Sequence, residues 1–165
     1  MNTTTRGAMR DNQPVTSTFT LVTRTGAPVE QLFDVSLNID AHEASMAASG
    51  ERAIEGVTNG AIGLGETVTW RARHFGIWFT MTSRLTSLER PQRFVDEQVR
   101  GPFRSFRHEH TFGTDSGMTV MTDTLTIRSP IFGMLAERLI LVPYLRRLIR
   151  GRNRHLLASL NATFQ

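Results

Sequence analysis

The sequence contains no cysteine and no lysine, and it has no long apolar run. Because there is no cysteine, disulfide bonds and thiolate metal sites are both excluded. The absence of lysine excludes no function, and we attribute it to codon usage. The longest apolar run, at residues 139–142, is far too short to span a bilayer. We therefore expect a soluble, cytoplasmic protein.

The chain has the length of one domain. Its 165 residues are enough to bury a substantial core. Residues 1–14 carry threonine, asparagine and arginine without an apolar run, so we expect a disordered leader and not a signal peptide. Residues 15–165 are then a single folded domain.

The net charge of +4 comes from one segment. Residues 132–165 hold six arginines against one acid, whereas the remaining chain holds thirteen arginines and fourteen acids. No nucleic-acid motif accompanies this basic segment, so nucleic acid is not an expected partner. A solvated arginine face is the simpler interpretation. The alternative is peripheral contact of the C-terminal helix with lipid headgroups through Arg146, Arg147 and Arg150.

The order of the expected elements indicates an α+β domain. Alternation predicts a first strand over 17–25, and two short helices follow over 27–35 and, after Asp40 as N-cap, over 41–46. Residues 52–57 are a weaker strand candidate.

From residue 66 onward the pattern is that of a meander. Turn residues separate five strand-like runs, at 66–75, 77–88, 93–100, 104–112 and 118–127. Because these connections are short, neighbouring strands must pair antiparallel.

The last thirty residues change to helical spacing, with arginines opposite an apolar face. That face consists of Leu135, Leu139, Val142, Leu145, Ile149, Leu156 and Leu160. Pro143 should kink this helix or split it in two.

The strand at 104–112 carries the most informative pattern. Every second residue from Phe106 to Phe112 lies on one face, so His108 and His110 share a face with two phenylalanines. The aromatic rings mark that face as buried. Buried imidazoles need polar partners, so other polar side chains should converge there.

The neighbouring strands supply such partners. If the turn at Gly101-Pro102 pairs Arg100 with Arg104, Asp96 lies opposite His108 and Gln98 lies opposite Phe106. On the next strand Asp123 shares the apolar face, which favours placing it opposite His108 as well. The expected result is a row of Asp96, His108 and Asp123 across three strands, with His110, Gln98 and Trp70 beside it.

Several stretches of the chain carry a family resemblance. They are Gly65–Gly76, Pro91–Gln98 with Gly101–Phe103, His108–His110 with Met121–Asp123, and Tyr144–Arg150 with Arg152–Arg154. Together they resemble bacterial members of the SRPBCC superfamily, in its START-like polyketide cyclase/dehydrase group, over about residues 17–160. The resemblance implies a helix-grip fold, in which a curved antiparallel sheet wraps a long C-terminal helix and encloses a cavity.

Three interpretations of the inward polar cluster follow. It can be a buried network that fixes strand register, or it can line a cavity for a small, largely hydrophobic, lipid- or polyketide-like ligand, as the resemblance implies. A metal site is chemically plausible, but the resemblance implies neither a metal nor a cofactor. The ligand-binding candidates are Trp70, His74, Asp96, Gln98, Phe106, His108, His110 and Asp123.

The superfamily's aromatase/cyclases imply an alternative function. A polyketide cyclase/dehydratase-like enzyme would use a His/Asp pair as general acid and base, and its catalytic candidates are His108, His110, Asp96 and Asp123. A third class is an interaction module or dimer that uses a strand edge or a helix, and the oligomeric state stays open.

The remaining aromatic and histidine residues are expected in ordinary roles. The large apolar side chains are more typical of core than of ligand contact: Trp70, Phe75, Trp78, Phe79, Met81 and Phe106. His42 and His155 are expected at the surface.

Overall fold

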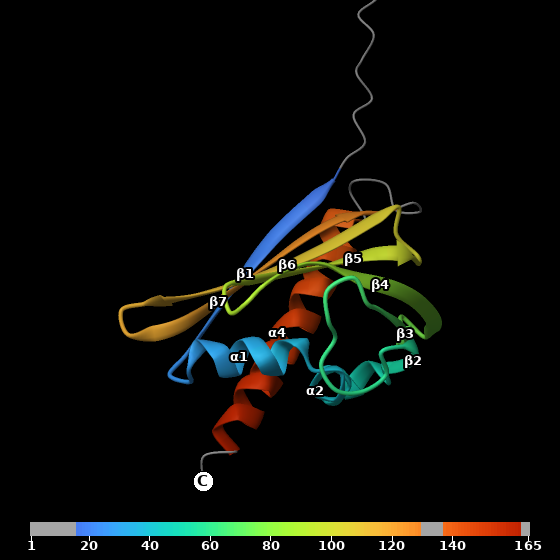
Figure 1. Ribbon diagram of the computed structural model, residues 1–165. Helices are drawn as coiled ribbons and strands as arrows, with labels where there is room; N and C mark the ends of the chain where they lie inside the picture. The colour runs from blue at the N-terminus through green and yellow to red at the C-terminus, as the bar shows by residue number, and fades with distance from the viewer. Residues whose placement is uncertain (1–15, 130–136, 163–165) are drawn as a thin grey trace, which may run out of the picture.

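The computed structural model describes residues 16–129 and 137–162. A curved sheet wraps the long helix α4 (Val142–Ala162), and two short helices lie beside α4 on the same face of the sheet (Figure 1). This is the predicted α+β helix-grip arrangement. The predicted leader, residues 1–14, lies outside the described residues, as does Leu135 of the expected helix.

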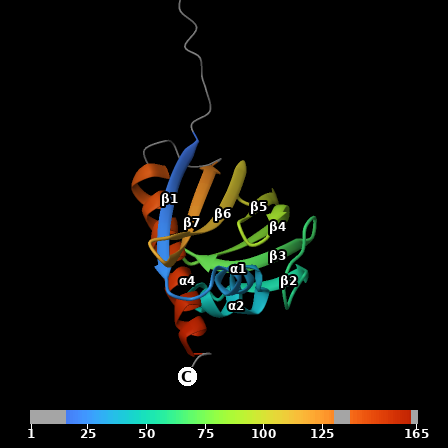
Figure 2. The same cartoon turned by 60° about the vertical axis from the view of Figure 1, so that its left-hand side comes forward.

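The sheet has seven antiparallel strands in the order β1-β7-β6-β5-β4-β3-β2. All the expected strands are present, close to their predicted ends: β1 (Ser17–Thr25), β2 (Arg52–Gly56), β3 (Thr67–His74), β4 (Ile77–Glu89), β5 (Arg93–Arg100), β6 (Ser105–Asp115) and β7 (Met118–Arg128). Because β1 pairs with β7, the strands β1 and β2 lie at opposite edges although they follow one another in the sequence (Figure 2).

The short helices α1 (Val29–Leu37) and α2 (Ile39–Ser45), with the 3-10 turn η1 (Ala47–Ser49), connect those two edges. The N-cap of α2 is Asn38, whose side chain accepts a hydrogen bond from Ala41 N at 2.8 Å. The prediction of Asp40 as N-cap is therefore wrong. The helix begins two residues earlier than expected because Ile39 is already helical and buried, and Asp40 instead accepts from Gly60 N.

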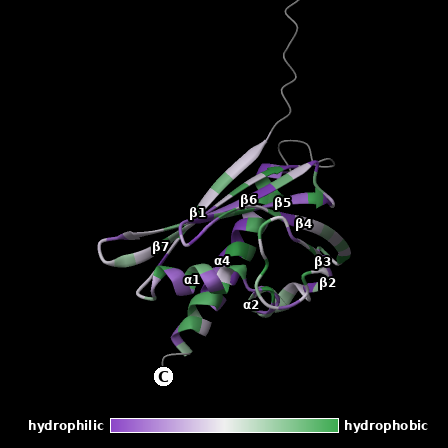
Figure 3. Cartoon of the chain, viewed as in Figure 1, coloured by the Kyte–Doolittle hydropathy of each residue, from purple (hydrophilic) through white to green (hydrophobic). Residues whose placement is uncertain are grey.

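The C-terminal helix is interrupted where Pro143 predicted. A short π-helical turn, η2 (Glu137–Leu141), precedes α4. Pro143 lies in the first turn of α4, where a missing N–H does no harm. Both α1 and α4 carry apolar and polar residues (Figure 3), as helices between a sheet and solvent do. Leu139 does not belong to the buried face, because its side chain is 66 % exposed.

The apolar core divides into separate groups along the sheet. One surrounds Leu32 and Phe33 of α1, and another joins β1 and β7 to Leu145 and Ile149 of α4. A third, smaller group surrounds Trp70 on β3. The concave face between these groups is not filled by side chains, and this leaves room for an internal cavity. Within residues 16–129 and 137–162, no helix is both long enough and apolar enough to cross a membrane.

Candidate functional site

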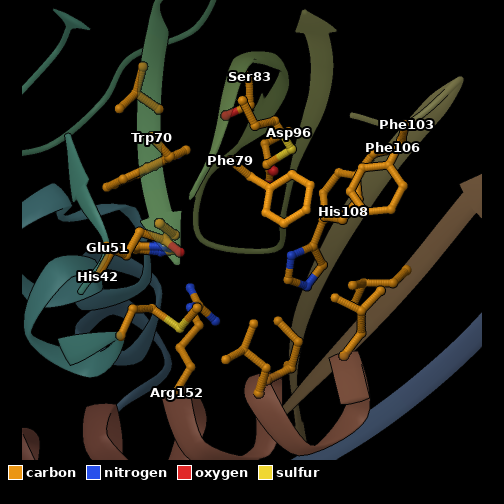
Figure 4. A pocket seen from close by; sticks show the side chains of 18 of the residues that line it. His42, Glu51, Trp70, Phe79, Ser83, Asp96, Phe103, Phe106, His108 and Arg152 are labelled. Carbon is orange, nitrogen blue, oxygen red and sulfur yellow. The ribbon is translucent and has the colours of Figure 1, made fainter. Parts of the chain in front are cut away.

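A cavity of about 500 Å³ lies between the concave face of the sheet and α4. Its walls are mostly apolar, with contributions from Val68, Ala72, Phe79, Leu125, Leu145 and Ile149. Polar side chains enter it from three places (Figure 4): the sheet, the region of α2, and α4. The chemistry that the cavity can perform depends on these polar groups.

The sheet contribution comes from β5 and β6. Asp96 lies opposite His108, as predicted from the turn between these strands. His110 lies two residues further along β6, and its Nε2 is 3.5 Å from Asp96 Oδ2. The three side chains line the cavity together. The side chain of Asp96 keeps 27 % of its surface exposed because it faces this cavity.

The pairing predicted for β7 is wrong. Leu125 lies opposite His108, and Asp123 lies opposite His110. The turn at Ser116 and Gly117 sets this register, which differs by two residues from the expected one. Since side chains alternate with a period of two, a shift of two residues keeps Asp123 on the inward face, where it reaches both histidines.

Asp123 is the centre of a buried network. One carboxylate oxygen accepts a hydrogen bond from His108 Nε2 at 2.9 Å and lies 2.9 Å from His110 Nδ1, at an angle too poor for a hydrogen bond. The other accepts from Asn153 Nδ2 at 2.6 Å. Arg152 Nη1 is 3.8 Å away. Asp123 is fully buried and does not line the cavity, so it supports the histidines from behind.

These contacts determine the charges of the network. Burial, followed by repulsion from His110, lowers the pKa of His108 to about 4, although two carboxylates favour its charged form. Burial alone would raise the pKa of Asp123, but the adjacent His108 and His110 outweigh it and hold that pKa well below its ordinary value. Burial is likewise outweighed at Asp96, whose pKa is lowered by His110 and His108.

At neutral pH, therefore, both carboxylates are ionised and His108 is neutral. An ionised carboxylate only accepts hydrogen bonds, so the proton of His108 must be on Nε2, facing Asp123. The lone pair of the imidazole is then on Nδ1. Asp123 thus fixes the tautomer of a histidine in the cavity wall.

Arg152 contradicts the prediction that the arginines of the helix lie on a solvated face. It is 3 % exposed and rises from α4 into the cavity (Figure 4). Its Nη2 donates to Ser36 O at 3.3 Å and its Nη1 to Asn153 Oδ1 at 3.2 Å, while Nε has no hydrogen-bond partner among the described residues. The sequence did carry a signal, because Arg152 lies three residues after Ile149, on the apolar face of the helix.

A second polar group lies across the cavity. His42 Nε2 is 2.7 Å from Glu51 Oε1, and the imidazole stacks on Trp70 with ring centroids 4.3 Å apart. Both His42 and Glu51 line the cavity, so the prediction of a surface position for His42 is wrong. Glu51, just before β2, belongs to no periodic pattern that could have revealed it. His155 is exposed, as predicted.

Six of the eight predicted ligand-binding residues line the cavity: Trp70, His74, Asp96, Phe106, His108 and His110. Asp123 lies behind them. Gln98 does not line the cavity, because its side-chain amide binds backbone instead: Nε2 donates to Phe103 O at 2.7 Å, and Oε1 accepts from Phe103 N at 3.2 Å. Gln98 therefore holds the β5–β6 turn.

The cavity opens beside the β3–β4 turn. Phe75 and Ile77 line it and are both more than half exposed, so they mark its mouth. There Tyr144 of α4 meets the turn, with its hydroxyl 2.7 Å from His74 Nδ1 and its ring 4.5 Å from that of Phe75. The prediction that Phe75 and Trp78 are core residues is wrong, since both Phe75 in this turn and Trp78 at the start of β4 are more than half exposed.

Asp96, His108 and His110 could also hold a metal ion. One potential ligand atom from each lies within 4.8 Å of the others. Two imidazoles and a carboxylate suit several divalent metals, and Asp123 would then orient both imidazoles from outside. The nearby Arg152 cation opposes such an ion.

Comparison with known proteins identifies the fold. No family model and no curated protein sequence matches the chain. Among solved structures, the chain is similar to the Zhui aromatase/cyclase from Streptomyces sp. R1128, with a TM-score of 0.72 at 15% identity over 92% of this chain and 97% of that one. It is also similar to Ara h 8.0201, with a TM-score of 0.67 at 11% identity over 90% and 99%.

A third similar structure is that of the major latex-like protein 151 from Panax ginseng, with a TM-score of 0.60 at 14% identity over 86% of this chain and 98% of that one. All three similarities extend over nearly the whole domain. The chain therefore has the fold of these proteins, the helix-grip architecture that its sequence resemblance implied.

Proposed function

We propose that this protein binds a small, largely apolar molecule in the cavity, with polar groups of that molecule held by the side chains that enter it. The observation that carries the proposal is the combination of an apolar cavity of about 500 Å³ with a few convergent polar groups. A purely structural network would need no such space beside it.

The polar side chains of the cavity indicate which chemical groups the ligand carries. Arg152 offers an unpaired Nε–H, so an oxygen of the ligand is its natural partner. Asp96 is ionised and accepts, and the neutral His108 also has an acceptor nitrogen. An apolar body that carries both an acceptor oxygen and a hydroxyl would satisfy these groups. Polyketide-like and oxygenated lipid-like molecules have this character.

Native mass spectrometry of protein taken from cells without detergent tests the proposal. We expect a co-purifying apolar mass. After delipidation, an environment-sensitive probe such as anilinonaphthalene sulfonate should bind, and Ala72→Phe should reduce that binding at least about tenfold, because a phenyl ring would fill part of the cavity.

The matched control is Ala44→Phe, at an exposed position of α2, which should leave probe binding unchanged. Circular dichroism verifies that both variants fold. Clean apoprotein, together with probe binding that Ala72→Phe does not weaken, would overturn the proposal and favour a structural network.

A second candidate function is acid–base catalysis, and one observation favours it. Asp123 holds the neutral His108 with its proton on Nε2, which is the arrangement that prepares an imidazole to act as a general base through Nδ1. Such a base could promote enolisation, aldol cyclisation or dehydration of a polyketide-like guest. Unchanged turnover of poly-β-carbonyl substrates by His108→Gln would exclude this role.

A further inference from the structure

Five large apolar side chains are exposed in two segments at the open end of the cavity, and two of them, Phe75 and Ile77, also line it. Phe75 belongs to the β3–β4 turn, Ile77 and Trp78 begin β4, and Leu139 and Ile140 belong to η2; each is more than half exposed. We call these five residues the mouth patch.

The two halves of the mouth patch meet at Tyr144. Its ring contacts Phe75, and its hydroxyl binds His74 at the end of β3. Ile140 precedes Tyr144 by four residues, about one helical turn, so the two side chains lie on the same side of the helix. Because Phe75, Ile77 and Tyr144 line the cavity, the mouth patch borders its opening.

Phe75 breaks two local rules at once. Its backbone has φ 52°, in the left-handed region that favours glycine or asparagine, and its ring is 58 % exposed. The β6–β7 turn has the same backbone form, with φ 51° at Ser116 and 78° at Gly117, but a small polar residue stands there. A strained and exposed phenylalanine gains little inside the molecule, which points to a partner outside it.

The exposed charges of the two segments that carry the mouth patch are of one sign. Residues 71–78 and 137–147 contain five arginines, and their single acid, Glu137, is buried. The guanidinium of Arg71 lies over the Trp78 ring, 4.6 Å from its centroid. Apolar side chains among arginines, with no exposed acid in these two segments, complement a lipid surface with anionic headgroups.

We propose that the mouth patch docks on a bilayer containing anionic lipids, so that the cavity opens toward the acyl chains. The patch residues enter the headgroup layer, and Arg71, Arg73, Arg138 and Arg147 contact phosphates. Docking requires no knowledge of the cavity ligand, so it can be tested on delipidated protein. It also relocates the membrane contact predicted from the C-terminal helix, since Arg146 lies over the Phe19 ring of β1.

Vesicle co-flotation tests the proposal directly. We compare vesicles of phosphatidylcholine alone with vesicles containing about one third phosphatidylglycerol, and expect binding to the second that weakens with salt. Of the two tryptophans, Trp70 is buried and Trp78 is exposed. In Trp70→Phe, the emission of Trp78 should therefore shift to shorter wavelength on binding and be quenched by brominated lipid.

Substitutions locate the docking surface. Ile77→Ser and Leu139→Ser should each weaken partitioning by about tenfold. Val22→Ser on β1 and Leu64→Ser before β3 remove equally exposed side chains outside the patch and should have no effect. For the charges, Arg147→Gln should weaken binding more than Arg154→Gln, which lies two turns further from the mouth.

Three results would overturn the proposal. They are the absence of binding to anionic vesicles, binding that Ile77→Ser and Leu139→Ser leave intact, and a dimer in light scattering that these substitutions dissolve, which would assign the patch to a second copy of the chain. None of them affects ligand binding in the cavity, since probe binding is measured without vesicles.

Discussion

The inner wall of the cavity and its mouth break opposite rules. The charged side chains of Arg152 in the wall and Asp123 behind it are buried, whereas at the mouth large apolar side chains such as Ile77 and Trp78 are exposed. The buried charges have partners inside the molecule. The exposed apolar side chains have few partners inside the molecule. A buried charge that has partners inside the molecule stabilises the fold and prepares a site. A large exposed apolar side chain without such partners instead points to a partner outside the chain.

The largest expected effect comes from removing the centre of the inner network. Asp123→Ala leaves His108 and Asn153 without their shared acceptor and Arg152 without its nearby counter-charge, and we expect a loss of about 3 to 5 kcal/mol in the free energy of unfolding. Urea denaturation measures it. Asp115→Ala, which breaks an exposed pair with Arg24, is the control and should cost much less. If Asp123→Ala and Asp115→Ala lowered the free energy of unfolding equally, the buried network around Asp123 would add nothing to stability.

The second largest effect is expected from acid, which should lower the free energy of unfolding through His108 in the inner wall. The folded-state pKa of His108 is about 4, below its ordinary 6.5, so the unfolded chain binds the proton more readily between these values. The stability is therefore complete above pH 6.5 and falls by about 3 kcal/mol as the pH drops to 4. The lowered pKa of Asp123 takes effect only at still lower pH.

Urea denaturation at several pH values measures this slope. His108→Gln should remove much of it, whereas His155→Gln, at an exposed position, should not. A slope that survives His108→Gln would assign the proton to another group.

A smaller effect, of opposite sign, is expected at the mouth. Phe75→Asn places in the β3–β4 turn a residue that tolerates its left-handed backbone, and we expect the protein to gain about 0.5 to 1 kcal/mol. Thermal unfolding measures the change. Ser116→Asn, in the equivalent turn of β6 and β7, should alter the stability little. A loss at Phe75 would show that its contact with Tyr144 outweighs the strain, and would give the ring an internal role.

The smallest effect is expected on metal removal. Because Asp96 already pairs with His110, His108 with Asp123, and the Arg152 cation lies close by, treatment with a chelator should shift the melting temperature by less than about 1 °C. Metal analysis of the purified protein accompanies the measurement. A drop of several degrees, with stoichiometric metal in the untreated protein, would replace the hydrogen-bonded network with a metal centre.

Much of the fold could be predicted from the sequence, because alternation and turn residues act locally. The strands from Ser17 to Arg128 and the interruption at Pro143 follow from short-range patterns. The inward face of His108, Asp96 and Asp123 followed as well. The register of β7 did not, since the number of residues that a turn absorbs is decided by backbone geometry rather than by the apolar pattern.

The other half of the cavity could not be predicted in the same way. Glu51 and His42 come together across different elements, and nothing in their local sequence distinguishes them from surface residues. The exposure of Phe75 and Trp78 depends on how far the β3–β4 turn extends beyond α4, which alternation does not report. Arg152 differs, because its position on the apolar face of the helix was visible in the spacing.

The order of the strands has a consequence for how the chain acquires its site. The first strand, β1, pairs only with the last, β7, so Ser17 can pair with Ile127 only after nearly the whole sheet sequence has been made. Contacts between residues so far apart in sequence form late and slow folding. During synthesis, the early strands and both short helices emerge before β7 and α4 exist, with the apolar face that will line the cavity still open. The cavity is therefore complete only once the final helix has packed, and until then that apolar face is exposed to aggregation.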